Sequence, residues 1–260
     1  MTVIPRPAST LMLLRQEGGK AAPQVLMIVR NAKTAFAGGA LVFPGGSVDQ
    51  ADHDLAGDIA GTYSHLTVEE LTLRIAAIRE TFEESGILLA CTDDGAPVAP
   101  ETVANLVTAC RGSDGPDFRA AIRAGGLLPA VDSLISFARW ITPPIRPKRF
   151  DTHFFIAAAP SGQSLAHDGS EAVDSIWIEP KAAIDGTSQG RFKLVFATRM
   201  NLNRIGAAAS MQDAMAQARA TPVVTIMPEY IETPEGTSIR IPAEAGYGGE
   251  LFPAADPPSM

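Results

Sequence analysis

Apolar residues recur along the chain with two spacings. Short runs of large and β-branched apolar residues predict strands at residues 9–14, 24–29, 41–43, 87–90, 134–141, 150–158 and 173–178. Apolar residues spaced three or four positions apart predict helices at residues 68–85, 101–110, 117–124 and 211–219. Strands that alternate with helices predict an α/β fold with a mixed sheet and helices on both faces.

The helix expected at residues 68–85 carries signals at both of its ends. Thr67 can cap the N-terminus, and Glu70, three residues further on, can complete a capping box with it. Gly86 follows the last expected helical residue and can end the helix, because glycine readily adopts the left-handed conformation found there. Local chemistry therefore predicts where this helix begins and ends.

Three carboxylates lie close together near the C-terminal end of the same helix. Glu80, Glu83 and Glu84 are spaced i, i+3 and i+4, which places them on one face. Like charges at this spacing repel unless a cation neutralises them, and hard oxygen ligands suit Mg²⁺ or Mn²⁺. Arg79 adds a rigid guanidinium fork that can hold one carboxylate in place. The cluster predicts a metal site, and the alternative is an acidic, solvated helix surface.

A glycine turn lies upstream of this helix. Residues 41–46 read Leu-Val-Phe-Pro-Gly-Gly, a short apolar strand followed by a turn. Glycine permits close approaches of the backbone that a side chain would block. Gly45 and Gly46 could therefore bring backbone groups near the acidic helix. Together the two segments could enclose a metal-bound diphosphate.

At these two segments the chain resembles the Nudix hydrolases. Residues 79–87 match the second half of the Nudix box: Arg-Glu, an apolar residue, any residue, Glu-Glu, any residue, Gly and an apolar residue. Only Thr81 departs from this pattern, because it stands where an aliphatic residue is usual. The Phe-Pro-Gly-Gly sequence that ends at Gly46 is also similar to the family's.

The first half of the box is interrupted. The whole box spans 42 residues here, from Gly46 to Ile87, whereas about 23 are usual in the family. Roughly 19 residues are therefore inserted near positions 50–68. Counted back from the arginine, the first glutamate of the box falls on Leu71, with Glu70 one place away.

An interrupted box resembles that of one branch of the family, the peroxisomal-type coenzyme A diphosphatases and their bacterial relatives. This branch shares Phe-Pro-Gly-Gly followed by an acidic residue, here Asp49. It also shares an Arg-Phe-Asp-Thr-x-Phe-Phe segment, here residues 149–155. The resemblance implies a coenzyme A diphosphatase.

Basic residues are candidate contacts for the phosphates of such a substrate. Another set of coenzyme A hydrolases in the family has an arginine ahead of the box, matched here by Arg30, although half of that signature is missing. Arg146, Lys148 and Arg149 form the densest basic patch and could meet a 3′-phosphate. The alternatives are solvent-facing charges or, for Arg149, a structural ion pair with Asp151.

The resemblance also implies a fold and roles within the site. It implies one Nudix domain over residues 1–260, an α/β/α sandwich with added helices near 101–130 and 190–219. The glycines and prolines from about residue 242 predict a flexible tail or arm. In the family, the positions of Glu80 and Glu84 are the main metal ligands. The position of Glu83 varies between metal binding and catalysis.

The general base of the family often lies on a late loop, outside the box. Glu171 precedes the strand expected at residues 173–178 and is therefore the candidate. The alternative is a loop carboxylate that caps a turn.

Composition limits the partners that we expect. The 260 residues are 46% hydrophobic and carry a net charge of −8, with a pI near 5.0, so nucleic-acid or anionic-membrane binding is not indicated. Cys91 and Cys110 are too few for a disulfide framework, and the start of the chain lacks a secretory segment. We expect a cytoplasmic protein that binds a small nucleotide substrate and that could form a homodimer.

Three functions remain open. The leading hypothesis is Mg²⁺- or Mn²⁺-dependent hydrolysis of coenzyme A or acyl-coenzyme A to 3′,5′-ADP and a phosphopantetheine. The second is the same chemistry on ADP-ribose or a dinucleotide. The third is a non-catalytic nucleotide-binding regulator, against which the three clustered glutamates argue.

Overall fold

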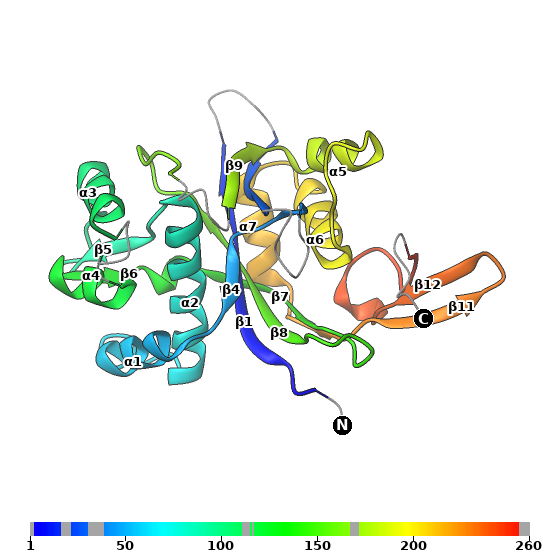
Figure 1. Ribbon diagram of the computed structural model, residues 1–260, viewed down its shortest axis with the longest axis horizontal. Coiled ribbons are helices and arrows are strands. Elements are labelled where there is room, and N and C mark those ends of the chain that lie inside the picture. The colour runs from blue at the N-terminus through cyan, green and yellow to red at the C-terminus, as the bar shows by residue number, and fades with distance from the viewer. Residues whose placement is uncertain are drawn as a thin grey trace.

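An eight-stranded mixed sheet forms the centre of the fold (Figure 1). The computed structural model describes residues 3–16, 22–30, 39–110, 115, 117–166 and 172–254. Six strands follow the order β10-β7-β8-β1-β2-β3, while β4 pairs with β1 and β9 pairs with β2. The strands are β1 (Arg6–Arg15), β2 (Gln24–Arg30), β3 (Leu41–Val42), β4 (Gly45–Ser47), β7 (Ile135–Ile141), β8 (Phe150–Ala158), β9 (Ala172–Ile178) and β10 (Thr225–Ile226).

Strand β1 lies inside this sheet and shares one of its edges between two partners. Along the other edge it pairs in parallel with β8, from residue 6 to residue 14. On the shared edge, β4 pairs with residues 8–10 and β2 pairs with residues 14 and 15, both antiparallel. Because β4 begins with Gly45 and Gly46, this arrangement brings the glycine turn into the sheet.

Alternate residues of β1 face two different hydrophobic cores, because successive side chains of a strand point to opposite faces. Leu11 and Leu13 belong to the core that includes residues of α1 (Gln50–Ile59), α2 (Val68–Ser85), α3 (Pro100–Cys110) and α4 (Phe118–Ala124). Met12 and Leu14 belong to the core that includes residues of α5 (Pro180–Ser188), α6 (Phe196–Gly206) and α7 (Met211–Ala220). Figure 1 shows these two groups of helices on either side of the sheet. The predicted α/β architecture is confirmed.

Two smaller sheets complete the described structure. β5 (Ala90–Thr92) pairs with β6 (Leu127–Pro129), and a three-stranded sheet joins β11 (Glu229–Thr233), β12 (Gly236–Arg240) and β13 (Leu251–Pro253). Short 3₁₀ helices lie at η1 (Val131–Ser133) and η2 (Ala243–Ala245).

The ends of α2 agree with the sequence prediction. The Thr67 side chain accepts a hydrogen bond from the Glu70 N–H at 3.2 Å, and the Glu70 carboxylate accepts one from the Thr67 N–H at 3.0 Å. Gly86 ends the helix with a φ of 75°, in the left-handed region. In the part of the chain that the structure describes, no helix is both long and apolar enough to cross a membrane.

The buried segment after α2 differs from the prediction. The sequence predicts a strand at residues 87–90, but residues 86–89 have no regular structure, and only Ala90 joins β5. Residues 87–89 are nevertheless buried. The Gln163 side chain satisfies both backbone groups of Leu88, at 2.8 and 3.0 Å. An apolar run indicates burial, and here a side-chain amide replaces the strand partner.

The C-terminal segment also differs from the expected flexible tail or arm. Within residues 242–254, Ala245 and Tyr247 are buried and β13 pairs with β12. The Tyr247 hydroxyl donates to Asn201 Oδ1 at 2.6 Å, and its ring centroid lies 5.5 Å from that of Trp140. The abundance of glycine and proline suggested little order, but a few aromatic and apolar anchors hold the segment against the core.

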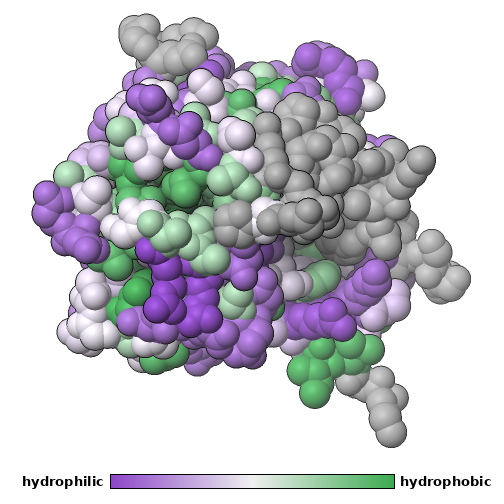
Figure 2. Space-filling view, turned by 60° about the vertical axis from the view of Figure 1, so that its left-hand side comes forward, coloured by the Kyte–Doolittle hydropathy of each residue, from purple (hydrophilic) through white to green (hydrophobic). Residues whose placement is uncertain are grey.

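The side of the molecule that carries α1 to α4 has a mixed surface. Figure 2 brings this side forward and shows strongly hydrophilic residues gathered beside hydrophobic ones. Ion pairs join α1 and α4 on this side: Arg119 of α4 lies 2.8 Å from Asp58 of α1, and Arg123 lies 3.3 Å from the same carboxylate. These exposed pairs link two helices, although each contributes little stability.

Candidate active site

The last turns of α2 lie directly against the glycine turn. A Cβ atom at Gly46 would lie 2.4 Å from Glu80 Oε1, so only glycine leaves room for this carboxylate. A Cβ atom at Gly45 would lie 2.5 Å from the Ser9 carbonyl oxygen. The Gly45 N–H donates to Glu84 Oε2 at 3.0 Å. The predicted approach of the glycine backbone to the acidic helix is therefore present.

Arg79 holds the carboxylates together. Its Nη1 donates to Glu80 Oε1 and to Glu83 Oε2, both at 2.9 Å. Its Nε and Nη2 donate to the two oxygens of Asp52, at 2.8 and 2.9 Å, and Nη2 also donates to the Ser47 carbonyl at 3.0 Å. These five bonds use all five donors of the guanidinium. Burial by itself lowers the pKa of Arg79, but the hydrogen bond to Asp52 and the surrounding carboxylates raise it overall, so the group stays charged.

Asp52 is a site residue that the sequence reasoning missed. Counting back from Arg79 placed the first acid of the box on Leu71 or Glu70, but Leu71 is buried in the core and Glu70 caps α2. Asp52 lies six residues after Gly46, which is the position of that acid when it is counted forward from the glycine. The inserted residues therefore follow Asp52 in the sequence, and helix α1 places Asp52 beside Arg79.

Local structure explains how Asp52 reaches its place. It is the third residue of α1 and forms a capping box with Asp49: Asp52 Oδ2 accepts from the Asp49 N–H at 3.0 Å, and Asp49 Oδ1 accepts from the Asp52 N–H at 3.1 Å. Its side chain is 1% exposed and that of Arg79 is 7% exposed. One carboxylate thus orders the start of α1 and neutralises a buried arginine.

Burial controls the charge of two of the glutamates. It raises the pKa of Glu80 to about 7; the charge of Arg79 opposes this shift and that of Glu83 adds to it. Burial likewise raises the pKa of Glu83, against the opposing charge of Arg79. A nearby divalent cation would favour the ionised form of both groups.

The chemistry of this donor set fits a divalent cation. Glu80 and Glu84 supply hard oxygen atoms from successive turns of one helix, and Gly45 and Gly46 keep side chains out of the space beside them. Within the described ranges, no three His, Cys, Asp or Glu side chains already converge into a metal-binding cluster. The assignment of Glu80, Glu83 and Glu84 as metal ligands stays a prediction.

Two candidate residues lie outside the described part of the chain. These are Glu171 and the side chain of Arg30, whose backbone ends β2. The Ala166 N–H donates to the Ser85 carbonyl at 2.7 Å, so the last described residue before this segment contacts the C-terminal end of α2. The roles of Arg30 and Glu171 stay predictions.

The predicted basic patch makes its described contacts within the chain itself. Arg149 is buried, and its guanidinium donates to the Thr142 carbonyl at 2.8 Å and to the Val3 carbonyl at 2.6 Å. The alternative pairing of Arg149 with Asp151 is wrong, because Asp151 pairs with Arg139 at 2.6 and 2.8 Å. Contact of Arg149 with a substrate stays a prediction.

The neighbouring Lys148 is exposed. An exposed lysine on a flexible stem could reach a phosphate without rearrangement of the fold. Its proposed contact with a 3′-phosphate likewise stays a prediction.

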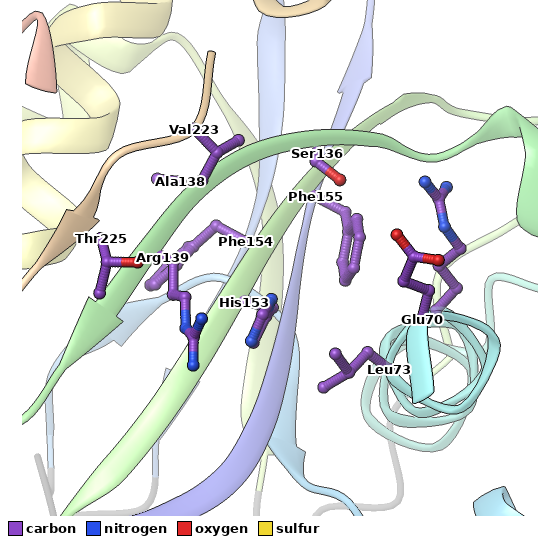
Figure 3. A pocket seen from close by; sticks show the side chains of 11 residues that line it. Glu70, Leu73, Ser136, Ala138, Arg139, His153, Phe154, Phe155, Val223 and Thr225 are labelled. Atoms are coloured by element: carbon purple, nitrogen blue, oxygen red, sulfur yellow. The ribbon is translucent and has the colours of Figure 1, made fainter. Parts of the chain in front are cut away.

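A cavity of about 240 Å³ lies at the other end of α2. Figure 3 shows Glu70 and Leu73 of this helix facing His153 and Phe155 of β8 across it. None of the three glutamates near the glycine turn lines this cavity. Glu70 therefore belongs to a different part of the helix surface from Glu80.

Comparisons with known proteins agree with these observations. The family model described as the NUDT19 Nudix domain matches residues 59–204. A Caenorhabditis elegans protein named as a nudix hydrolase is 32% identical over 177 residues, which are 67% of this chain and 53% of that protein. A Xenopus laevis protein named acyl-coenzyme A diphosphatase NUDT19 is 25% identical over an alignment of 206 positions that covers 62% of this chain and 54% of that protein. The chain spans about half the length of these curated relatives.

A solved structure is similar over most of the chain. The crystal structure of a NUDIX hydrolase from Alicyclobacillus acidocaldarius superposes with a TM-score of 0.66 at 29% sequence identity and covers 82% of this chain and 96% of that chain. The matched family model covers more than half of the 260 residues. The chain belongs to the Nudix hydrolase family.

Proposed function

We propose that this chain is a diphosphatase that hydrolyses coenzyme A or acyl-coenzyme A, with Mg²⁺ or Mn²⁺, to 3′,5′-ADP and a phosphopantetheine or acyl-phosphopantetheine. The observation that carries the chemistry is Arg79, whose buried guanidinium binds Asp52, Glu80 and Glu83 beside the glycine turn. The substrate class is supported by the similarity to relatives named acyl-coenzyme A diphosphatase.

In this proposal the residues of the chain have separate tasks. Glu80 and Glu84 bind the cation, and the Gly45 N–H orients the carboxylate of Glu84. A bound divalent cation neutralises diphosphate oxygens and lowers the pKa of water. Arg79 keeps Glu80 and Glu83 in place, while Asp52 keeps Arg79 charged and oriented. Glu171 accepts the proton of the attacking water.

The proposal is tested with a substrate panel. Coenzyme A, acyl-coenzyme A, ADP-ribose and NADH are incubated with the protein and Mg²⁺ or Mn²⁺, and the products are identified by mass spectrometry. We expect 3′,5′-ADP from the first two substrates at a higher kcat/KM than any product from the others. Faster turnover of ADP-ribose or NADH would replace the proposed substrate. No turnover of any of them by folded protein would favour a regulatory role.

Paired variants identify the residues responsible. Glu80→Gln should lower kcat at least a hundredfold, because it removes a charged ligand at the point where phosphate charge develops. Glu69→Gln is the matched control, since Glu69 is an exposed glutamate in the first turn of the same helix. Equal activity of the two variants would contradict the proposed site. The cytoplasmic location and the homodimer stay predictions.

A further inference from the structure

Ser9 of β1 carries a buried hydroxyl group that has no hydrogen-bond partner. The residue is fully buried, and its Oγ is one of four buried side-chain polar atoms without a partner among the described residues. A buried polar group without a partner destabilises a fold, so such a group needs an explanation. Its neighbours in the sheet suggest one.

Strand register places Ser9 beside the candidate active site. Ser9 pairs with Gly46 of β4 on one side and with His153 of β8 on the other. Paired residues direct their side chains to the same face, and opposing Cβ atoms of an antiparallel pair lie about 5 Å apart. Leu11 and Leu13, which share this face of β1, pack in the same core as α2. The side chain of Ser9 therefore lies on the α2 face of the sheet.

The carboxylate of Glu80 occupies the position next to Ser9. Gly46 has no side chain, and a Cβ atom placed there would lie 2.4 to 2.6 Å from the carboxyl carbon and both oxygens of Glu80. Glu80 thus takes the place of the side chain that would otherwise oppose Ser9. In the described structure Glu80 Oε1 accepts from Arg79, and Glu80 Oε2 accepts no hydrogen bond.

The two groups complement each other chemically. A carboxylate that ligates a metal through one oxygen is usually held by a hydrogen bond to the other, which fixes its orientation. The serine hydroxyl has one donor for this purpose. Its lone pairs could accept from His153 at the same time. Figure 3 shows the His153 side chain on β8 beside β1.

We propose that Ser9 is a positioning residue for Glu80, whose carboxylate it holds by donating a hydrogen bond when the cation is bound. The inference rests on the proposed function, because it gives Glu80 a metal to ligate. It assigns a task to a hydroxyl group that has no hydrogen-bond partner in the metal-free fold.

The test compares metal affinity with stability in the Ser9→Ala variant. Binding of Mn²⁺ is measured by titration calorimetry, and unfolding of the metal-free protein is measured by its Tm. We expect Ser9→Ala to weaken Mn²⁺ binding at least tenfold. Its Tm should be equal to or above that of the unmodified protein, because alanine removes an unpaired polar group.

Ser175 provides a matched control. It is a buried serine of β9 whose hydroxyl also lacks a partner, but it pairs with Ile28 and not with a residue of the glycine turn. We expect Ser175→Ala to bind Mn²⁺ as tightly as the unmodified protein. Because Ser9 acts through Glu80, adding Ser9→Ala to Glu80→Gln should cause little further loss of affinity.

Each other outcome overturns a stated claim. If the unmodified protein binds no Mn²⁺, the metal-dependent function fails and the inference fails with it. If the unmodified protein binds Mn²⁺ and Ser9→Ala binds it equally well, only the inference fails. A lower Tm in Ser9→Ala, or an equal loss of affinity in Ser175→Ala, would show a general structural effect and would also overturn it.

Discussion

The substitution Asp52→Asn should destabilise the protein because it removes one charge from a buried ion pair. Both side chains are almost inaccessible to solvent, and the carboxylate accepts two bonds from Arg79. Leaving a buried charge without its partner typically costs about 3 to 5 kcal/mol. In the variant, Arg79 still has its hydrogen bonds to Glu80 and Glu83. We therefore expect a loss at the lower end of this range, about 3 kcal/mol.

This magnitude can be measured by urea unfolding. A loss of about 3 kcal/mol lowers the ratio of folded to unfolded protein roughly 150-fold. With a slope of about 3 kcal/mol per molar urea, the unfolding midpoint should fall by about 1 M at an unchanged slope. Asp58→Asn is the control, because the pair of Asp58 with Arg119 is exposed and should contribute less than about 1 kcal/mol.

The same substitution should also reduce catalysis. Arg79 orients Glu80 and Glu83, and without Asp52 it loses two of its five hydrogen bonds. We expect kcat of the folded variant to fall at least tenfold, because small displacements of catalytic groups are costly. Glu70→Gln should leave kcat unchanged, since Glu70 caps the N-terminus of α2, at the other end of the helix from Glu80. A change in stability no larger than that of Asp58→Asn, or a larger effect on kcat from Glu70→Gln, would refute the assignment of Asp52.

Two further predictions concern the carboxylate of Glu80. Its pKa of about 7 lies above the ordinary value of 4.5, so the folded metal-free protein binds more protons than the unfolded chain between those pH values. This contribution to stability, about 3 kcal/mol at most, is present below pH 4.5 and is lost as the pH rises to 7. The free energy of unfolding, measured with urea at pH 5 and pH 8, should therefore differ less between the two pH values in Glu80→Gln than in the unmodified protein. An unchanged difference would contradict the raised pKa. Gly46→Ala should displace Glu80 and lower kcat at least tenfold, because its Cβ atom would collide with the carboxylate. Gly57→Ala in α1, where a Cβ atom meets nothing within 4 Å, should keep full activity, and equal rates for the two variants would contradict the close approach.

Local chemistry made the boundaries of α2 predictable. Thr67 and Glu70 form their capping box within four residues, and Gly86 adopts the left-handed conformation that ends the helix. The prediction of a strand at residues 87–90 was wrong, because the apolar residues there signal burial without indicating what satisfies the backbone. Gln163, far along the chain, decides that point by bonding both backbone groups of Leu88.

The order of the C-terminal segment depended on contacts that no local pattern reveals. Its glycines and prolines favour loops, but Tyr247 reaches Asn201 and Trp140 across the second core. In the same way, Arg149 lies in a basic run that suggested a solvent-facing or anion-binding charge, yet its side chain is buried and donates to the backbone carbonyls of residues 3 and 142. Long-range packing decided the order of the segment and the burial of Arg149.

The sequence by itself determined the family, the acidic face of α2 and the glycine turn, because these depend on residue types at short, fixed spacings. Only the tertiary structure decided which acid pairs with Arg79. Asp52 lies 27 residues before that arginine, and helix α1 and the turn after it separate the two, so no fixed spacing connects them. The pairing arises because burial of the guanidinium requires a carboxylate, and the folded insertion places Asp52 within reach.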